Sequence, residues 1–477
     1  MATALVVSPF IINGLGFNNY GAWLLATSFA GYLEFLDLGF STAAVRSYSR
    51  AIGTNNTGQL RGLFEFLQKH YLRLGVAVIG LGGLLLLGAL SFNPGLAVPS
   101  VTLMTALLIV LNGIVFSFRA RATLLKARLE YGKIIGTGLA RLLVFTGVVV
   151  WWGEEGVTLW KLIGLQVMLQ ILEQVAVYFW AGPLVPKASG AEFSKQDRSI
   201  FLSFAKDVAL SGVTTALRHR IDVQLLGWYV SMASISHYSI GSRLPSLFFD
   251  MVNSVFGGHL MAGFTQMVAT NDPARVQNAL FRMLRLSGVA AVTGGTGICV
   301  FGPVFIECWL GTHLAATTPV LQMLTLGAAV TALHYPVISF LGAINAWGTV
   351  VRMSVISAAL NFICSWILVQ QMGTMGVVWG TFGEQLAWSL LLWPVMIAKE
   401  TDIPLWKYVR VVFFESALPL TLTTVPLCLA LRHWMQPDSF LDLALCTSVV
   451  GVHAAAACCV LDVETRDLVM RKLGIRK

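Results

Sequence analysis

Composition places the 477-residue chain outside the soluble proteins. Hydrophobic residues make up 56% of it and charged residues 12%, and the mean hydropathy is +0.75, whereas soluble domains carry about 25% charged residues. The net charge of +9 does not indicate a nucleic-acid partner, because the charges lie in short loops and no basic domain is present to hold a duplex. The seven Cys lack metal-ligand spacing, so we expect no metal site and no cofactor.

Apolar segments recur along the whole chain, and each is close to the about 20 helical residues that cross a ~30 Å hydrocarbon core. We therefore expect an all-α polytopic membrane protein with about fourteen transmembrane helices. Their predicted ranges are 1–12, 21–45, 72–92, 100–118, 134–151, 158–180, 207–229, 236–266, 285–306, 317–341, 350–370, 374–397, 410–431 and 440–461.

The first of these segments is short. About a dozen apolar residues separate Met1 from the polar turn NGLGFNN, and about 18 Å of helix does not cross a bilayer. The segment has neither the charged start nor the cleavage site of a signal peptide. We therefore expect the natural start to lie about 15 to 20 residues upstream.

Lysine and arginine are sorted between alternate loops. Of the 32 Lys and Arg, about 26 fall in one set of loops and in the C-terminal tail, about one lies in the other set, and about five lie within spans. The intervening loops NGLGFNN, SFNPGLAVP and WGEEG carry almost none. By the positive-inside rule, the basic loops and both termini are predicted to be cytoplasmic.

The sequence aligns with itself at an offset of about 216 residues. The alignment places Glu34 and Asp37 of LEFLDLGF over Asp250 and Asn253 of FDMVNSVF, and a second window near residue 130 agrees at the same offset. The repeat covers an even number of spans, so its two halves share one orientation in the membrane. We therefore expect two pseudo-symmetric six-helix lobes followed by a C-terminal helix pair.

The predicted domain boundaries follow from the repeat and from composition. The segment 186–206 is rich in Pro, Ser and charge, which is typical of a linker. We expect an N-lobe at 1–185 (spans 1 to 6), this cytoplasmic linker, a C-lobe at 207–398 (spans 7 to 12), and spans 13 and 14 with a basic cytoplasmic tail at 399–477.

Two stretches resemble a known transporter family. NNYGAWLLATSFAGYLEFLDLGFSTAAVRSYSRAIG (18–53) resembles the second-span region of bacterial polysaccharide transporters. LGAINAWGTVVRMSVISAALNFICSWILV followed by MGVVWGT, with its Asn361, resembles the late-span pattern of the multidrug, oligosaccharidyl-lipid and polysaccharide exporter superfamily. The resemblance implies a two-lobed, V-shaped transporter that alternates access. In the polysaccharide branch, such a transporter flips an undecaprenyl-diphosphate-linked oligosaccharide outward across the bacterial inner membrane.

The implied substrate predicts cations inside the membrane. Moving a diphosphate head group through hydrocarbon requires compensation for its desolvation, and guanidinium groups in a wet cavity supply it. Ionisable side chains within spans normally face protein or water. A structural alternative stays open for Arg218, because Asp222 lies one helical turn away. The predicted substrate-binding residues are Arg46, Arg141, Arg218, Arg220 and Arg243.

Acidic side chains within the spans form the second candidate group. They could bind a coupling H⁺ or Na⁺, or could neutralise the arginines, and the second role is expected for most of them, Glu173 and Glu384 included. We predict the ion-coupling site at Glu34, Asp37, Asp250 and Asn253. His334, close to a Pro break, is expected to be packed and hydrogen-bonded.

Other functions were weighed against flipping a lipid-linked sugar. A cation-coupled multidrug exporter of the same superfamily is the nearest alternative. A membrane enzyme of polysaccharide assembly needs a sizeable external loop with catalytic side chains, which is missing, so we expect no enzyme. The sequence has no Gly-Lys-Ser/Thr motif for nucleotide binding, so we do not expect an ATP-driven pump. The expected partners are the lipid-linked oligosaccharide, membrane lipids and polysaccharide polymerase or assembly proteins.

Overall fold

The structure is a computed structural model, and it describes residues 2–37, 39–54, 56–185, 193–256, 258–269, 272–311, 314–344 and 346–461. Every regular element in these ranges is a helix. Nine of the described helical segments are long and apolar enough to cross a membrane. The predicted all-α polytopic fold is confirmed.

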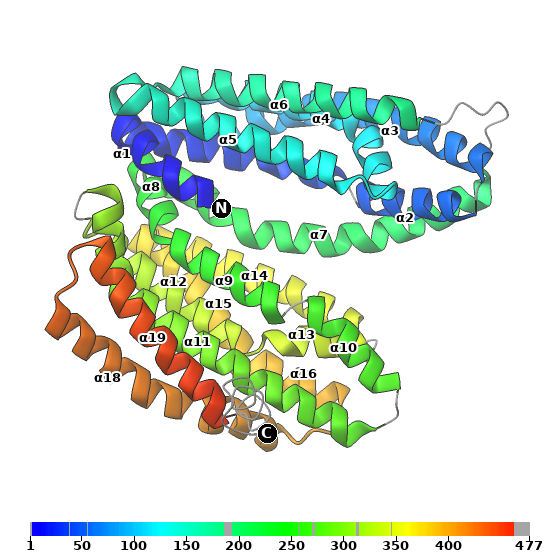
Figure 1. Cartoon of the computed structure of the whole chain (residues 1–477). Helices are drawn as coiled ribbons and strands as arrows, with labels where there is room; N and C mark the ends of the chain where they lie inside the picture. The colour runs from blue at the N-terminus through cyan, green and yellow to red at the C-terminus, as the bar shows by residue number, and fades with distance from the viewer. Residues whose placement is uncertain are drawn as a thin grey trace. The chain divides into compact units, whose positions relative to one another are not determined.

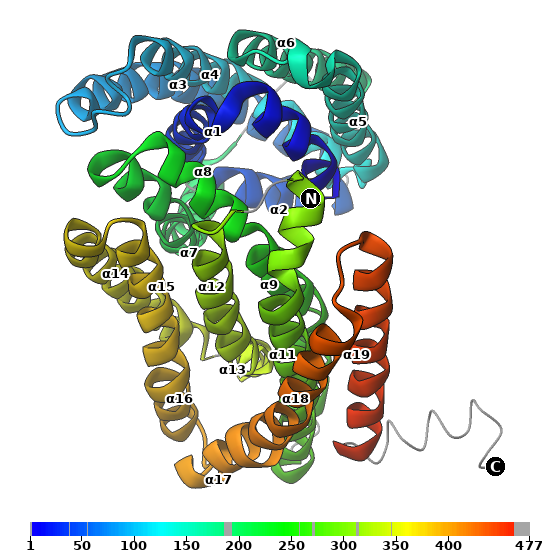
Figure 2. The same ribbon diagram turned by 90° about the vertical axis from the view of Figure 1, so that its left-hand side faces the viewer.

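The described helices form two compact units, Met1–Ser236 and His237–Lys477. In the first unit α3 and α4 run side by side, as do α5 and α6 (Figures 1 and 2). The elements of this unit are α1 (Ala2–Tyr32), η1 (Leu33–Asp37), α2 (Phe40–Gly53), α3 (Thr57–Leu90), α4 (Pro99–Ala127), α5 (Tyr131–Gly156), α6 (Leu159–Ala181), η2 (Gly182–Leu184), α7 (Lys195–Tyr229) and the first half of α8 (Met232–Gly241).

In the second unit α11 lies beside α12, and α14 lies beside α15. The C-terminal helices α18 and α19 pack on α11 through a small apolar cluster that includes Phe301, Cys428 and Cys446. The elements of this unit are α9 (Arg243–Phe256), α10 (Gly258–Ala269), α11 (Pro273–Leu310), α12 (Thr317–Ala332), α13 (Tyr335–Ala343), α14 (Trp347–Met372), α15 (Thr374–Ala387), η3 (Trp388–Leu392), α16 (Trp393–Glu400), α17 (Leu405–Val409), η4 (Arg410–Ala417), α18 (Leu418–Met435) and α19 (Phe440–Leu461).

Helix boundaries repeat along the chain at the offset found in the sequence. Thr57 begins α3, and Pro273, 216 positions later, begins α11. Tyr131 begins α5, and Trp347, again 216 positions later, begins α14. The paired residues differ in type, yet each pair begins helices at equivalent positions of the repeat. This agreement supports the predicted internal repeat.

Several predicted boundaries were wrong. The span expected at 236–266 is divided among α8, α9 and α10, and two further errors lie near the start of the chain. The turn expected at 13–19 is helical, and α1 continues through it with a kink at Gly16, whose φ is 72°. The span expected at 21–45 is two helices, because η1 and Gly39 interrupt it. Gly39 has φ 73°, a left-handed conformation that costs glycine little and other residues more.

The predicted linker 186–206 already contains the start of α7. Ser194 caps this helix, since its side chain accepts a hydrogen bond from the Asp197 backbone N–H at 3.0 Å. Phe193 and Phe201 pack against rings of α2 and α3, with centroids 5.1 Å from Phe66 and 5.2 Å from Phe40. The helix α7 therefore packs within the first unit. The division into six-helix lobes stays a prediction.

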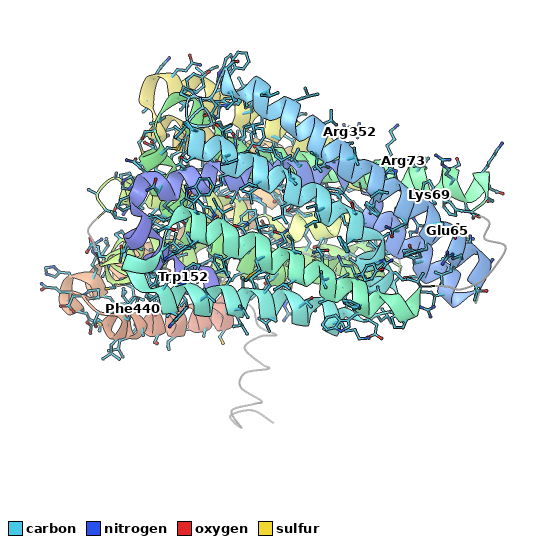
Figure 3. The ribbon with its side chains drawn as sticks, turned by 90° about the horizontal axis from the view of Figure 1, so that it is seen from above. Glu65, Lys69, Arg73, Trp152, Arg352 and Phe440 are labelled. Carbon is cyan, nitrogen blue, oxygen red and sulfur yellow. The ribbon has the colours of Figure 1, made fainter. Side chains whose placement is uncertain are left out.

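Basic side chains of α3 and a tryptophan of α5 lie toward opposite ends of the first unit. Figure 3 shows Lys69 and Arg73 on α3 toward one end and Trp152 of α5 toward the other. Basic side chains at one membrane face and Trp at an interface are typical of a spanning bundle. The chain is therefore a multi-pass membrane protein, and the predicted cytoplasmic side is the end that carries Lys69.

The pair α14 and α15 depends on glycine for its close approach. A Cβ added at Gly376 would lie 2.2 Å from the Leu368 carbonyl oxygen, and one added at Gly380 would lie 2.6 Å from the Ser365 backbone nitrogen. Two helices in a bilayer associate by such close packing, since lipid provides little hydrophobic drive between them.

We expect Gly376→Ala to destabilise the protein, because the added methyl group meets backbone atoms that cannot rotate away. The expected loss is about 1–3 kcal/mol, measured as a lower Tm in detergent. Gly383→Ala on the same helix is the matched control, since nothing lies within 4 Å of its added Cβ. An equal Tm for both variants would contradict the packing.

Candidate functional site

The break between η1 and α2 positions the predicted coupling residue Asp37. Its carboxylate accepts hydrogen bonds from the Ser41 backbone N–H at 3.0 Å and from the Ser41 hydroxyl at 2.8 Å. These bonds satisfy an amide at the start of α2 and put negative charge at the positive end of the helix dipole. Within the local sequence Leu-Asp-Leu-Gly-Phe-Ser, the serine therefore hydrogen-bonds to the aspartate four residues before it.

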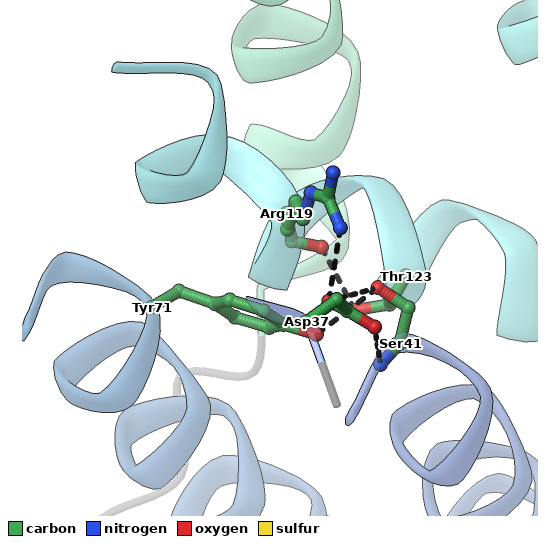
Figure 4. Close-up of polar contacts among 5 residues, drawn as sticks. All are labelled: Asp37, Ser41, Tyr71, Arg119 and Thr123. Atoms are coloured by element: carbon green, nitrogen blue, oxygen red, sulfur yellow. Dashed lines mark hydrogen bonds and ion pairs between the residues drawn. The ribbon is translucent and has the colours of Figure 1, made fainter. Parts of the chain in front are cut away.

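A third helix completes this network. Arg119 of α4 places Nη1 3.1 Å from Asp37 Oδ1, and its guanidinium lies 3.9 Å from the centre of the Phe116 ring. The Ser41 hydroxyl also lies 3.1 Å from the Tyr71 hydroxyl of α3. Figure 4 shows the resulting Asp37 network, with side chains from η1, α2, α3 and α4. Asp37 therefore joins three helices and carries a paired charge.

The sequence reasoning missed Arg119. It was grouped with the loop cations, because it follows the predicted span 100–118 directly and lies 82 residues from Asp37 in the sequence. The structure extends α4 to Ala127, so Arg119 lies on the helix and reaches inward, and its side chain is 23% exposed. The sequence offered one signal for such a partner: an acid inside a span, such as Asp37, normally requires a paired cation.

The other candidates in the first unit are arranged differently. Arg141 of α5 is paired with Glu173 of α6, with Nε 2.8 Å from Oε2. Arg46 lies on the exposed face of α2. Glu34 is exposed on η1, and the i, i+3 spacing on a 3-10 helix stacks it directly over Asp37. A substrate role for Arg46 and Arg141 stays a prediction.

In the second unit, α9 gathers three predicted residues on one face. Arg243 and Asp250 are half-buried and lie two helical turns apart, and Asn253 is exposed one turn from Asp250. Among the described residues, Arg243 has no acidic partner within ion-pair distance. The opposite, buried face carries Pro245, Phe248, Val252 and Phe256. A polar stripe therefore runs along the side of α9 that faces away from this unit's core.

Two predicted substrate-binding arginines lie outside the described side chains. The helix α7 is described, but the side chains of residues 207–220, including Arg218 and Arg220, are not. The predicted pairing of Arg218 with Asp222 is therefore untested. The proposed quartet divides between the units, with Glu34 and Asp37 in the first and Asp250 and Asn253 in the second.

A buried polar seam joins α14 and α15. Its members on α14 are spaced four residues apart, so they share one face of the helix. The contacts are Ser357 Oγ to the Glu384 carboxylate, Asn361 Nδ2 to Thr381 Oγ1 at 3.1 Å, and Ser365 Oγ to the Val377 carbonyl oxygen at 3.4 Å. Glu384 is 3% exposed, so the seam holds an acid within a predicted span. In the part of the chain that the structure describes, no three potential metal ligands cluster.

His334 has the packed role that was expected. It is fully buried at the break between α12 and α13, and its Nδ1 lies 2.6 Å from the Tyr408 hydroxyl. Its ring stacks with those of Trp393 and Tyr408. Pro336, in the first turn of α13, lacks a backbone N–H and so favours a helix start here.

The fold is that of known lipid and drug transporters. The chain superimposes on the inward closed conformation of the lipid II flippase MurJ with a TM-score of 0.68, at 15% identity over 99% of this chain and 97% of that one. A multidrug resistance transporter of the MATE family and MOP superfamily, in an inward-facing conformation, gives a TM-score of 0.65 at 11% identity, over 88% of this chain and 96% of that one. At these identities the likeness establishes the fold alone.

Sequence comparison decides the family. The model of the family described as "Polysaccharide biosynthesis protein" matches residues 15–319. The chain belongs to this family. A curated relative, the probable low-salt glycan biosynthesis flippase Agl15 of Haloferax volcanii, is 21% identical over 187 residues. The match covers 39% of this chain and 39% of that relative. The predicted relationship to a polysaccharide biosynthesis family is confirmed.

We expect Asp37→Asn to destabilise the protein by about 1–3 kcal/mol, because it leaves the Arg119 guanidinium without its counter-charge. Arg119→Ala should have a similar effect, and the double variant should lose less than the sum, by about 0.5–3 kcal/mol. The measurement is a double-mutant cycle of thermal unfolding in detergent.

Arg61→Ala is the control for this cycle. Arg61 pairs with Glu65 at a more exposed site of α3, where the side chains are 31% and 43% exposed, so its removal should cost below about 1 kcal/mol. Additive effects of Asp37→Asn and Arg119→Ala would mean that the Asp37 network does not act as a unit.

Proposed function

We propose that this protein flips an undecaprenyl-diphosphate-linked oligosaccharide across the bacterial inner membrane by alternating access. Family membership in polysaccharide biosynthesis and the fold shared with a lipid flippase support the proposal. The observation that carries it is the polar stripe of α9. A half-buried arginine within a predicted span is costly in lipid, and a water-filled path for an anionic substrate accounts for it.

The chemistry of the stripe fits a diphosphate lipid. Guanidinium groups bind phosphate oxygens in a bidentate manner, and they do so most strongly where water is partly excluded. Arg243 provides such a group on α9, and Arg46 provides one on the exposed face of α2. Under this proposal Arg46, near the cytoplasmic end, receives the head group, and Arg243 holds it during transfer. Arg218 and Arg220 are proposed as further substrate-binding cations, as is Arg141.

We propose that a cation, H⁺ or Na⁺, drives the cycle through the acids of the two units. Asp250 and Asn253 lie beside Arg243 on the same face of α9, so protonation or ion binding there would change the field at the phosphate site. In the first unit, Asp37 is paired with Arg119. A cation that competes for Asp37 would release Arg119 and loosen the three-helix junction.

The sorted charge supports cytoplasmic termini, and a flippase of lipid-linked repeat units delivers them to polymerase or assembly proteins at the outer face. A cation-coupled multidrug exporter is the second candidate, because the MATE transporter shares the fold at nearly the same TM-score. Drug export requires no phosphate ligand, so arginine variants separate the two functions.

We expect deletion of the gene to abolish the surface glycan and to accumulate its undecaprenyl-linked repeat units on the cytoplasmic face. Arg243→Ala should reduce export at least about tenfold at normal protein level, since a charge-assisted hydrogen bond contributes about 1.5–3 kcal/mol. Arg243→Lys tests whether charge alone suffices.

Arg352→Ala is the control for export, because Arg352 lies outside α9 and contacts Gly348 and Thr349 of its own helix. Unchanged surface glycan in the deletion strain would refute the flippase. Normal export by Arg243→Ala would remove the α9 stripe from the substrate path.

We expect Asp250→Asn to remove the dependence of transport on a H⁺ or Na⁺ gradient, because the amide cannot take up a proton and binds a cation weakly. The measurement is translocation of the lipid-linked oligosaccharide in proteoliposomes with an imposed gradient of each ion. Glu65→Gln, at an exposed position of α3, is the matched control. A full response to both gradients in Asp250→Asn would exclude this acid from coupling.

A further inference from the structure

A pocket between α10 and α11 combines cations with an apolar wall. It has a volume of about 590 Å³. The polar side chains of α11 in its lining are Arg275, Asn278 and Arg282, which recur every three to four residues and so share one face of the helix. The apolar wall comes from both helices and includes Leu260, Phe264, Met267 and Met283. This pairing of cations and apolar surface fits an anionic amphiphile.

Among the described side chains that line the pocket, two are positively charged and one is negatively charged. Arg275 and Arg282 line it together with Asp272. Asp272 caps α11, since its carboxylate accepts a hydrogen bond from the Arg275 backbone N–H at 3.0 Å. Its negative charge is thus already engaged by the helix start. Arg275 and Arg282 are the cationic side chains of the described lining.

The opposite side of the same helix end has the opposite charge. A second pocket of about 400 Å³ is lined by Asp272, Glu400 and Asp402, and no Lys or Arg lines it within the described ranges. Glu400 already accepts a hydrogen bond from the Thr349 hydroxyl at 2.7 Å. The first turns of α11 therefore separate basic from acidic side chains, and the basic side chains are concentrated on the side that faces α10.

The length of α11 places the basic pocket at the membrane surface. The helix has 38 residues, which is about 57 Å at 1.5 Å per residue, while the hydrocarbon core is about 30 Å thick. Arg275 and Arg282 lie within its first ten residues. These residues extend beyond the hydrocarbon into the head-group region, where phosphates of the bilayer are found.

We propose that the pocket between α10 and α11 binds an anionic phospholipid of the bilayer. Arg275 and Arg282 bind the phosphodiester, the Asn278 amide donates a further hydrogen bond, and an acyl chain lies against Phe264 and Met267. Two arginines beside an apolar wall match a phosphate head group joined to acyl chains. The site is independent of the proposed transport function and of which leaflet the pocket faces.

The test measures binding of phosphatidylglycerol to the purified full chain in detergent, by native mass spectrometry. Wild type should bind it at least about tenfold more tightly than phosphatidylcholine. The double variant Arg275→Ala/Arg282→Ala should bind it about 30-fold more weakly than wild type, since each cation near anionic lipid contributes about 1 kcal/mol and 1.4 kcal/mol is tenfold. Arg352→Ala should bind as wild type.

Each other outcome overturns the proposal. Wild-type binding by the double variant, or equal binding of the two lipids, would show that the arginines do not select the head group. Competition by free glycerol phosphate would indicate a site for soluble phosphate, and tighter binding of undecaprenyl diphosphate would indicate a substrate site. An unchanged Tm of the double variant in phosphatidylcholine confirms its fold. No glycan substrate is used, so failure here leaves the proposed flippase untouched.

Discussion

The hydrocarbon core of the membrane leaves no water to solvate a charge or an unpaired backbone group, and the structure depends on how the chain meets this constraint. The backbone meets it by forming helices throughout the described ranges. The charges meet it by pairing within each unit. Asp37 binds Arg119, Arg141 binds Glu173, and Glu415 binds both Arg285 and Arg410. Of the acids for which neutralisation was expected, Asp37 and Glu173 are paired with arginine, whereas the Glu384 carboxylate accepts a hydrogen bond from the Ser357 hydroxyl.

Against this background, the polar stripe of α9 differs from the paired charges. Arg243 has no acidic partner among the described side chains, and its helix buries a purely apolar face on the other side. The Asp37 network has the opposite character, because Asp37 accepts two hydrogen bonds from Ser41 and is paired with Arg119, which also lies against the Phe116 ring. The α9 stripe therefore suits reversible binding of a ligand. The Asp37 network suits a junction between helices whose strength a cation could change.

The internal repeat gives the two units equivalent helices, but the equivalents are used differently. The stretch 33–39 consists of η1 and a break at Gly39 before α2, whereas the corresponding stretch of the second unit is continuous helix as far as Phe256. Gly39 with its positive φ accounts for the break, because the equivalent position, Val255, has a branched side chain that disfavours this conformation. The Asp37 junction therefore has no copy in the second unit, where Asn253 stands at the equivalent position on the exposed face of α9.

The sequence by itself determined that the protein lies in a membrane, that it is helical, the order of its spans and the offset of the repeat. Each of these depends on composition and on local periodicity. It also singled out Arg243, Asp250 and Asn253, whose spacing already puts them on one helix face. Only the tertiary structure decided which charges pair. Arg119 meets Asp37 across 82 positions, and Arg285 meets Glu415 across 130. Such partners are set by how helices pack against one another, and no pattern along the chain records which loop cation reaches inward.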